Sequence, residues 1–119
     1  EVEPLLLGLI ESYNTKKTKS INLHELSYFH SNFEKIHPFQ DGNGKIGRFL
    51  LLKQCLENNI DLIAIHEKYN KEYRDALYES QLNQNYDNLI ETFKKCQNYI
   101  KSKEDIIISS NEALKNLKK

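Results

Sequence analysis

The sequence of 119 residues contains no methionine and no tryptophan. A natural reading frame normally supplies a methionine at its first position, whereas this chain opens on Glu1 and continues directly into a helix-forming stretch. We therefore expect the chain to be a fragment or a trimmed product of a longer protein.

Long apolar runs and an excess of charge of one sign are also lacking. No run approaches the roughly 18 apolar residues that a transmembrane helix requires, and the first residues do not form a signal-peptide pattern. The 17 basic and 17 acidic residues give a formal net charge of zero, which is not the basic footprint of a nucleic-acid-binding protein. We expect a cytoplasmic protein that binds neither a membrane nor a nucleic acid.

Cysteine is scarce, because only Cys55 and Cys96 occur. Each lies in a helical pattern, and the two could form a disulfide. Buried free thiols in a reducing compartment are the favoured interpretation. The length fits a single domain with one hydrophobic core.

Apolar residues recur at helical spacing along most of the chain. We predict an all-α fold, a compact core of about six helices over residues 1–100, and a tail over 101–119 with a short helix that begins near Ser109. The stretch after residue 45 is apolar almost all round, so we expect it to be a central helix that is buried on every side. It should end near Asn58.

The connections between these helices are also predicted. Residues 14–20 are polar and basic, which is typical of a solvated loop. Asn22 followed by Glu25 has the spacing of a capping box at the start of the second helix. The apolar run 60–65 has no partner strand, so it is expected to be a buried connection or a short helical turn.

One loop holds most of the residues that carry chemistry, and it reads HPFQDGNGKIGR over His37 to Arg48. Gly42 and Gly44 tolerate left-handed backbone angles, so successive N–H groups here can form a concave anion nest. The nest opens into the N-terminus of a helix, which also favours negative charge. Lys45 in the first turn and Arg48 one turn later suit a polyphosphate.

The same loop places a carboxylate and an imidazole beside the predicted phosphate site. Asp41 would repel phosphate unless Mg²⁺ lay between them, and this cation typically takes one or two carboxylates together with phosphate oxygens. His37 precedes Pro38, which disfavours helical angles at the residue before it. Histidine changes protonation near neutral pH, so His37 is suited to take a proton from a hydroxyl. The loop indicates metal-assisted transfer from a nucleotide.

Other interpretations of these residues are less favoured. An ordinary glycine-containing loop does not explain His37, Asp41 and Arg48 at these spacings, and a Walker-type loop requires Ser or Thr after the lysine. His30 lies two helical turns before His37, but a packing role is favoured over a metal pair. Tyr69 and Tyr73 are aromatic residues that could line a nucleotide base, and again a core role is favoured.

The loop resembles the signature of the Fic domain family, enzymes that move AMP from ATP onto protein hydroxyls. The matching positions are His37, Phe39, Asp41, Gly42, Asn43, Gly44 and Arg48. Lys45 stands where the family usually has arginine. The resemblance extends to about Asn98, and the last twenty residues do not share it.

The resemblance implies a role for each motif residue. His37 would be the general base that deprotonates a Ser, Thr or Tyr hydroxyl of a target protein, and Asp41 would hold Mg²⁺ against the phosphates of ATP. Gly42, Asn43 and Gly44 would cradle phosphate oxygens. Lys45 would replace the first arginine as a mobile point charge, and Arg48 would hold the γ-phosphate. Phe39 would anchor the loop in the core.

Two parts of the family pattern are not found in the sequence. The flap that docks the target segment would precede Glu1, and no glutamate has Ser or Thr four residues before it, as the inhibitory helix of the family requires. We expect an inhibitory helix, if there is one, in a missing region or on a separate protein. The chain is therefore predicted to be an adenylyltransferase. The alternatives are a fragment without activity, the transfer of another phosphate-containing group, and a non-catalytic nucleotide-binding or interaction module.

Overall fold

A computed structural model describes residues 2–17, 20–37 and 42–117. Over these ranges the chain forms helices and connections without any strand, which confirms the all-α prediction. The elements are α1 (Val2–Lys17), α2 (Leu23–Ile36), α3 (Asn43–Glu57), the 3₁₀ turn η1 (Glu67–Tyr69), α4 (Asn70–Asn83) and α5 (Asp87–Leu117). These five helices and one turn are close to the predicted number of about six.

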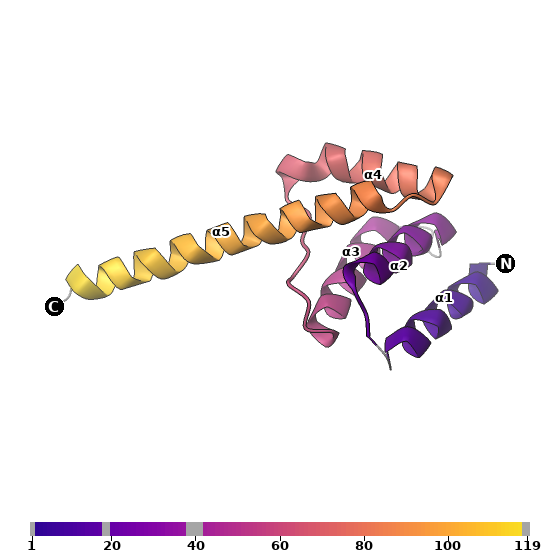
Figure 1. Cartoon of the computed structure of the whole chain (residues 1–119), viewed down its shortest axis with the longest axis horizontal. Helices are drawn as coiled ribbons and strands as arrows, with labels where there is room; N and C mark the ends of the chain where they lie inside the picture. Colours follow the sequence, from indigo (N-terminus) through magenta and orange to yellow (C-terminus); the bar gives the residue numbers. More distant parts are fainter. Residues whose placement is uncertain (1, 18–19, 38–41, 118–119) are drawn as a thin grey trace.

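Helix α2 lies at the centre of the bundle, because it contacts α1, α3, α4 and α5 (Figure 1). Its buried residues recur every three or four positions, as expected for one face of a helix. They are Leu26, Ser27, Phe29, His30, Ser31 and Phe33. The helix that ends at the loop is therefore the one held by the largest number of neighbours.

Helix α3 ends at Glu57 as predicted, but it is not buried on every side. Its buried positions form one stripe, made by Gly47, Leu51, Gln54 and Cys55. Phe49 and Leu56 lie on other faces and are 68% and 69% exposed. The prediction of all-round burial is wrong. Within the described residues, α2 and the connection after α3 cover only one face of this helix, whereas its apolar residues extend around several faces.

The start of α2 has the cap that the sequence predicts. The Asn22 side-chain oxygen accepts a hydrogen bond of 3.0 Å from the backbone N–H of Glu25. Loss of such a cap typically costs about 1 kcal/mol. We expect Asn22→Ala to lower the melting temperature by several degrees in thermal unfolding, whereas Asn22→Ser keeps a capping oxygen and stays near the parent. Equal melting temperatures for the two variants would contradict this role.

Helix α1 is longer than predicted and less buried. It continues to Lys17, so residues 14–17 are helical and not part of a loop. Lys17 Nζ lies 3.0 Å from Glu57 Oε2, and Tyr13 donates a 3.1 Å hydrogen bond to the same carboxylate. These contacts fasten the end of α1 to the end of α3, and they explain why the basic residues extend the helix. Leu9 is the buried residue of α1.

Residues 60–65 form a connection without regular structure, and Ile63 is 1% exposed. The predicted connection is confirmed, but its predicted burial holds only for Ile63, because Asp61, Leu62 and Ala64 are exposed. Helix α5 continues without a break through Ser109, so the separate short helix predicted there is wrong. Residues 101–117 are exposed along the half of α5 that extends away from the bundle (Figure 1). The division of the chain at residue 100 stays a prediction.

Cys55 and Cys96 are buried free thiols, as favoured from the sequence. Burial raises the pKa of both groups, so neither thiol has the character of a reactive nucleophile. Among the described helices, none combines the length and the apolar composition needed to cross a membrane.

Candidate functional site

His37 stands at the C-terminal end of α2, where the chain leaves the helix. Its backbone is left-handed, with φ 55° and ψ 58°, and its N–H donates a 3.2 Å hydrogen bond to the Phe33 carbonyl. The residue before a proline is usually extended, whereas His37 takes the left-handed geometry typical of a helix end. Its side chain is exposed. The predicted base is therefore placed by a helix that packs against four others.

Gly42 begins the second half of the loop and caps α3. Its φ of 77° and ψ of 11° are left-handed, and its carbonyl accepts a 3.0 Å hydrogen bond from the Ile46 N–H. A left-handed residue followed by helical ones is a geometry that turns successive N–H groups toward one point. The first turn of α3 contains no acidic residue, and Gly42 has no side chain to cap it. This helix start is suited to an anion.

Gly44 does not use the left-handed backbone angles that glycine tolerates, and its predicted contact with phosphate stays a prediction. It lies inside α3, and Gly42 is the one described glycine with positive φ. A Cβ at Gly44 would lie 3.0 Å from Arg48 Nη1, so the Arg48 side chain folds back over the first turn of the helix. Gly44 leaves room for the guanidinium, while Lys45 is exposed in the same turn. Two cations thus lie near the end of the helix that attracts negative charge.

Several predicted residues lie outside the described part of the chain. Phe39 and Asp41 fall between the described ranges, so their predicted roles as anchor and magnesium ligand stay predictions. Asn43 is the first residue of α3. Within the residues that the structure describes, no three His, Cys, Asp or Glu side chains are grouped as ligands for a metal ion.

A carboxylate that the sequence reasoning did not single out lies behind the loop. Glu34, on the last turn of α2, has a buried Oε1 without a hydrogen-bond partner among the described residues. Burial raises the pKa of this carboxyl, and the charges of Arg48 and His37 act to lower it. Both predicted site residues therefore influence Glu34 electrostatically. Its position three residues before His37 was the sequence signal.

His30, one helical turn before Glu34 on α2, forms a second polar group with Tyr73. His30 Nε2 and the Tyr73 hydroxyl are 2.5 Å apart, and both side chains are buried. Burial lowers the pKa of His30 to about 4, so this imidazole is neutral at pH 7. Burial also raises the pKa of Tyr73, the charge of Glu34 raises it further, and Arg48 acts to lower it. The packing roles favoured for His30 and Tyr73 are confirmed.

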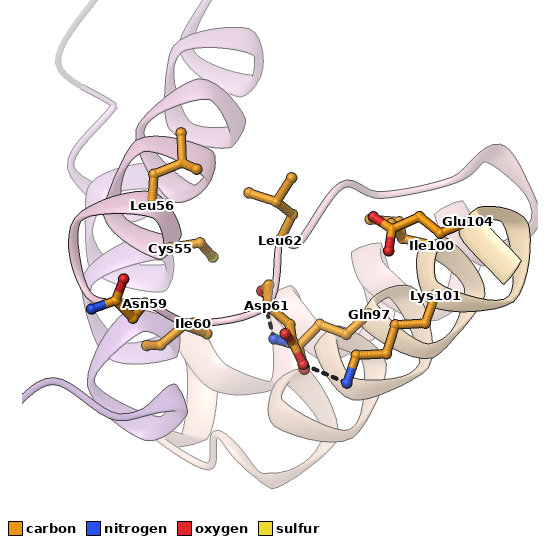
Figure 2. Close-up of a pocket in the computed structure, with 10 residues that line it drawn as sticks. All are labelled: Cys55, Leu56, Asn59, Ile60, Asp61, Leu62, Gln97, Ile100, Lys101 and Glu104. Atoms are coloured by element: carbon orange, nitrogen blue, oxygen red, sulfur yellow. Dashed lines mark hydrogen bonds and ion pairs between the residues drawn. The ribbon is translucent and has the colours of Figure 1, made fainter. Parts of the chain in front are cut away.

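A pocket of about 370 Å³ lies at the opposite end of α3, between the connection at 60–62 and α5 (Figure 2). Lys101 Nζ lies 2.6 Å from Asp61 Oδ2, and Gln97 donates a 2.8 Å hydrogen bond to the Asp61 carbonyl. Because these polar side chains already bind one another, the pocket offers weaker ligand chemistry than the loop.

The fold and the loop define a class of protein: an α-helical bundle in which an exposed histidine ends one helix and a left-handed glycine precedes the next. The model of the Fic/DOC family matches residues 1–55, which include this loop. The part of the chain that carries the candidate site is therefore similar to the Fic/DOC family, and the predicted resemblance is confirmed.

Two relatives extend the match beyond the loop. A probable protein adenylyltransferase of Aquifex aeolicus is 40% identical over 78 residues, which is 63% of this chain and 24% of that protein. A Fido domain-containing protein of Dictyostelium discoideum is 34% identical over 86 residues, which is 66% of this chain and 60% of that protein. The chain thus spans about a quarter of the first relative and three-fifths of the second.

Proposed function

We propose that the chain carries the catalytic core of a protein adenylyltransferase, which moves AMP from ATP to a Ser, Thr or Tyr hydroxyl of a target protein. The observation that carries this proposal is the start of α3, where left-handed Gly42 is the N-cap and the Arg48 side chain folds back over Gly44. The similarity to a probable protein adenylyltransferase of Aquifex aeolicus supports the same type of transfer. An inhibitory helix on another segment or protein is part of the proposal.

Each of these loop residues would have a separate role in the transfer reaction. The target hydroxyl oxygen attacks the α-phosphorus, the new O–P bond forms, and the bond to the β-phosphate breaks so that pyrophosphate leaves. His37 takes the hydroxyl proton. The N–H groups that follow Gly42 stabilise the negative charge that develops on the phosphate oxygens, a term that is often the largest in such reactions. Arg48 holds the γ-phosphate.

Magnesium fits the donor set that this loop supplies. Asp41 is a single carboxylate next to Gly42, and Mg²⁺ bound to a nucleotide typically takes one or two carboxylates together with phosphate oxygens. Such a site needs no cluster of protein ligands. When bound, the ion would neutralise charge on the phosphates.

Asp41→Ala is expected to reduce the binding of ATP in the presence of Mg²⁺ to the level found without the ion. The reason is that the loop loses the carboxylate that bridges to the metal. Isothermal titration of the parent and the variant, each with Mg²⁺ and with EDTA, measures this. Asp75→Ala, which removes an exposed carboxylate on α4, is the control. Unchanged Mg²⁺-dependent binding by Asp41→Ala would remove the metal role from Asp41.

Labels at two positions of ATP, the α-phosphate and the γ-phosphate, decide which group is transferred. We expect incubation with Mg²⁺ and ATP to place the α-phosphate label, but not the γ-phosphate label, on protein, with an AMP increment in the mass of the modified protein. Labelling from the γ-position would instead show a phosphotransferase. Measurable ATP binding with no transfer to any protein would favour the non-catalytic binding module.

A further inference from the structure

We propose that two copies of the chain pair through the outer half of α5, residues 101–117, in antiparallel orientation. Each copy places the end of its α5 in the pocket of the other that Figure 2 shows. The pairing does not depend on the proposed transfer reaction, because this pocket and the 37–48 loop lie at opposite ends of α3.

The first observation is an apolar stripe that continues along α5 beyond the bundle. Residues three, four or seven positions apart share one face of a helix. With this spacing the stripe consists of Leu89, Phe93, Cys96, Ile100, Ile107, Leu114 and Leu117. Its first three members are buried in the bundle, and its last three are exposed, Leu117 to 82%. The face that α5 buries in the bundle therefore continues uncovered over the outer half, among the described residues.

The charges of the outer half permit it to pair with itself. Residues 101–117 contain three lysines and three acidic residues, so they carry no net charge. Lys103 is the charged residue on the stripe, where its Nζ lies 5.1 Å from the centroid of the Tyr99 ring. A polar residue in an apolar seam lowers stability but favours one register and one number of helices.

The second observation is the pocket where the outer half of α5 begins. Its volume is about 370 Å³, and residues of α3, of the connection at 60–62 and of α5 line it (Figure 2). Leu56 and Leu62 line it from one side and are both exposed. Ile100 and Glu104 line it from α5. The pocket thus combines an apolar rim with the point at which the stripe leaves the bundle.

The pocket and the end of α5 are complementary features of one chain. Ile100 and Leu117 are seventeen positions apart, which is about 25 Å along a helix. In an antiparallel pair Ile100 faces the partner's Leu117, which then also reaches Leu56 and Leu62. The same contact forms at the other end, so both pockets are filled, as in a closed two-fold dimer.

Charge at the pocket favours a second copy as the occupant. Lys101 Nζ is paired with Asp61 Oδ2 at 2.6 Å. Glu104 is left at the rim without an ion pair among the described residues. Lys115 lies in the last turn of α5. In the antiparallel register it lies on the same side as the partner's Glu104 and about two residues along the helix from the position opposite it, which a lysine side chain can span. Symmetry forms this pair twice.

Sedimentation velocity of the full chain tests the pairing. A range of roughly 1–200 μM is suitable, because an interface of this size is at the low end for specific association. We expect a reversible change from one chain to two as the concentration rises. A chain that remains a monomer over the whole range, or that assembles beyond two copies, overturns the inference.

Two neighbouring isoleucines provide a matched comparison on α5. Ile107 and Ile108 are 58% and 56% exposed, but only Ile107 lies on the stripe. We expect Ile107→Gln to raise the dissociation constant at least about tenfold, since two copies of the contact are lost. Ile108→Gln should associate like the parent. Equal weakening by the two variants, with helicity retained by circular dichroism, would show that the stripe is not the interface.

A second matched pair tests the pocket. Leu56 lines it, whereas Phe49 is equally exposed on α3 but does not. We expect Leu56→Gln to weaken the dimer and Phe49→Gln to leave it unchanged. A dimer that tolerates Leu56→Gln would contradict the insertion of α5 into the pocket.

A charge exchange tests the ion pair between copies. Glu104→Lys and Lys115→Glu should each weaken the dimer several-fold, because each places like charges together. The double variant restores opposite charges and should return toward the parental dissociation constant. Additive weakening in the double variant would contradict the proposed register.

Disulfide formation in air distinguishes the antiparallel pair from a parallel one. We expect Ile100→Cys and Leu117→Cys to give a linked dimer only when both changes are in one chain. In a parallel pair each single variant would link to its own counterpart, and that result overturns the inference. The parent is the control, because Cys55 and Cys96 are buried.

Discussion

Replacement of His37 by alanine is expected to lower the rate of AMP transfer by about 10²- to 10⁴-fold, the usual contribution of a general base. Binding of ATP should remain, because the phosphate contacts come from the start of α3 and not from the imidazole. Transfer of the α-phosphate label measures the rate, and titration with ATP measures binding. Transfer by His37→Ala at the parental rate would remove the general-base assignment.

The backbone of His37 calls for a second variant. Its left-handed geometry is one that asparagine tolerates better than alanine. His37→Asn therefore removes the imidazole while keeping the backbone conformation at the end of α2. We expect it to lose transfer as fully as His37→Ala with a melting temperature closer to that of the parent. Restored transfer in His37→Asn would show that backbone geometry, and not proton transfer, limits the alanine variant.

Replacement of Phe93 by alanine is expected to lower the free energy of unfolding by about 3–5 kcal/mol, as for other fully buried aromatic residues. Phe93 is 0% exposed on α5, and its ring meets the His30 ring edge to face at a centroid distance of 5.7 Å. Since a domain typically has only about 5–15 kcal/mol of stability, this single change removes a large share of it.

Urea denaturation of the full chain measures this loss. Leu82→Ala is the matched control, because Leu82 is 63% exposed on α4 and surface substitutions usually change stability by less than about 0.5 kcal/mol. A loss below about 1 kcal/mol for Phe93→Ala would contradict the packing of α5 against the buried face of α2.

Local signals in the sequence predicted the helices well. Asn22 and Glu25 indicated the start of α2, and the pattern around Asn58 indicated the end of α3, because caps and breaks depend on a few neighbouring residues. The loop from His37 onward was recognised for the same reason, since its residue types and spacings are local. The resemblance to the Fic/DOC family followed from that stretch.

Which face of α3 is buried could not be predicted from the local sequence pattern. Apolar residues surround this helix, and only the packing of α2 decides that Leu51 is buried while Phe49 is exposed. The close packing of Gly47 against Glu34 was missed for a related reason. Its close approach to Glu34 joins residues thirteen positions apart across two helices, and a single sequence gives no measure of that distance.

Helix α2 contacts every other α-helix of the bundle and ends at residue 37. The backbone that presents the imidazole is therefore the last turn of the most constrained element of the molecule. Heating that unfolds the bundle also displaces His37, so under the proposed function we expect the loss of transfer and the melting of the bundle to occur in the same temperature range.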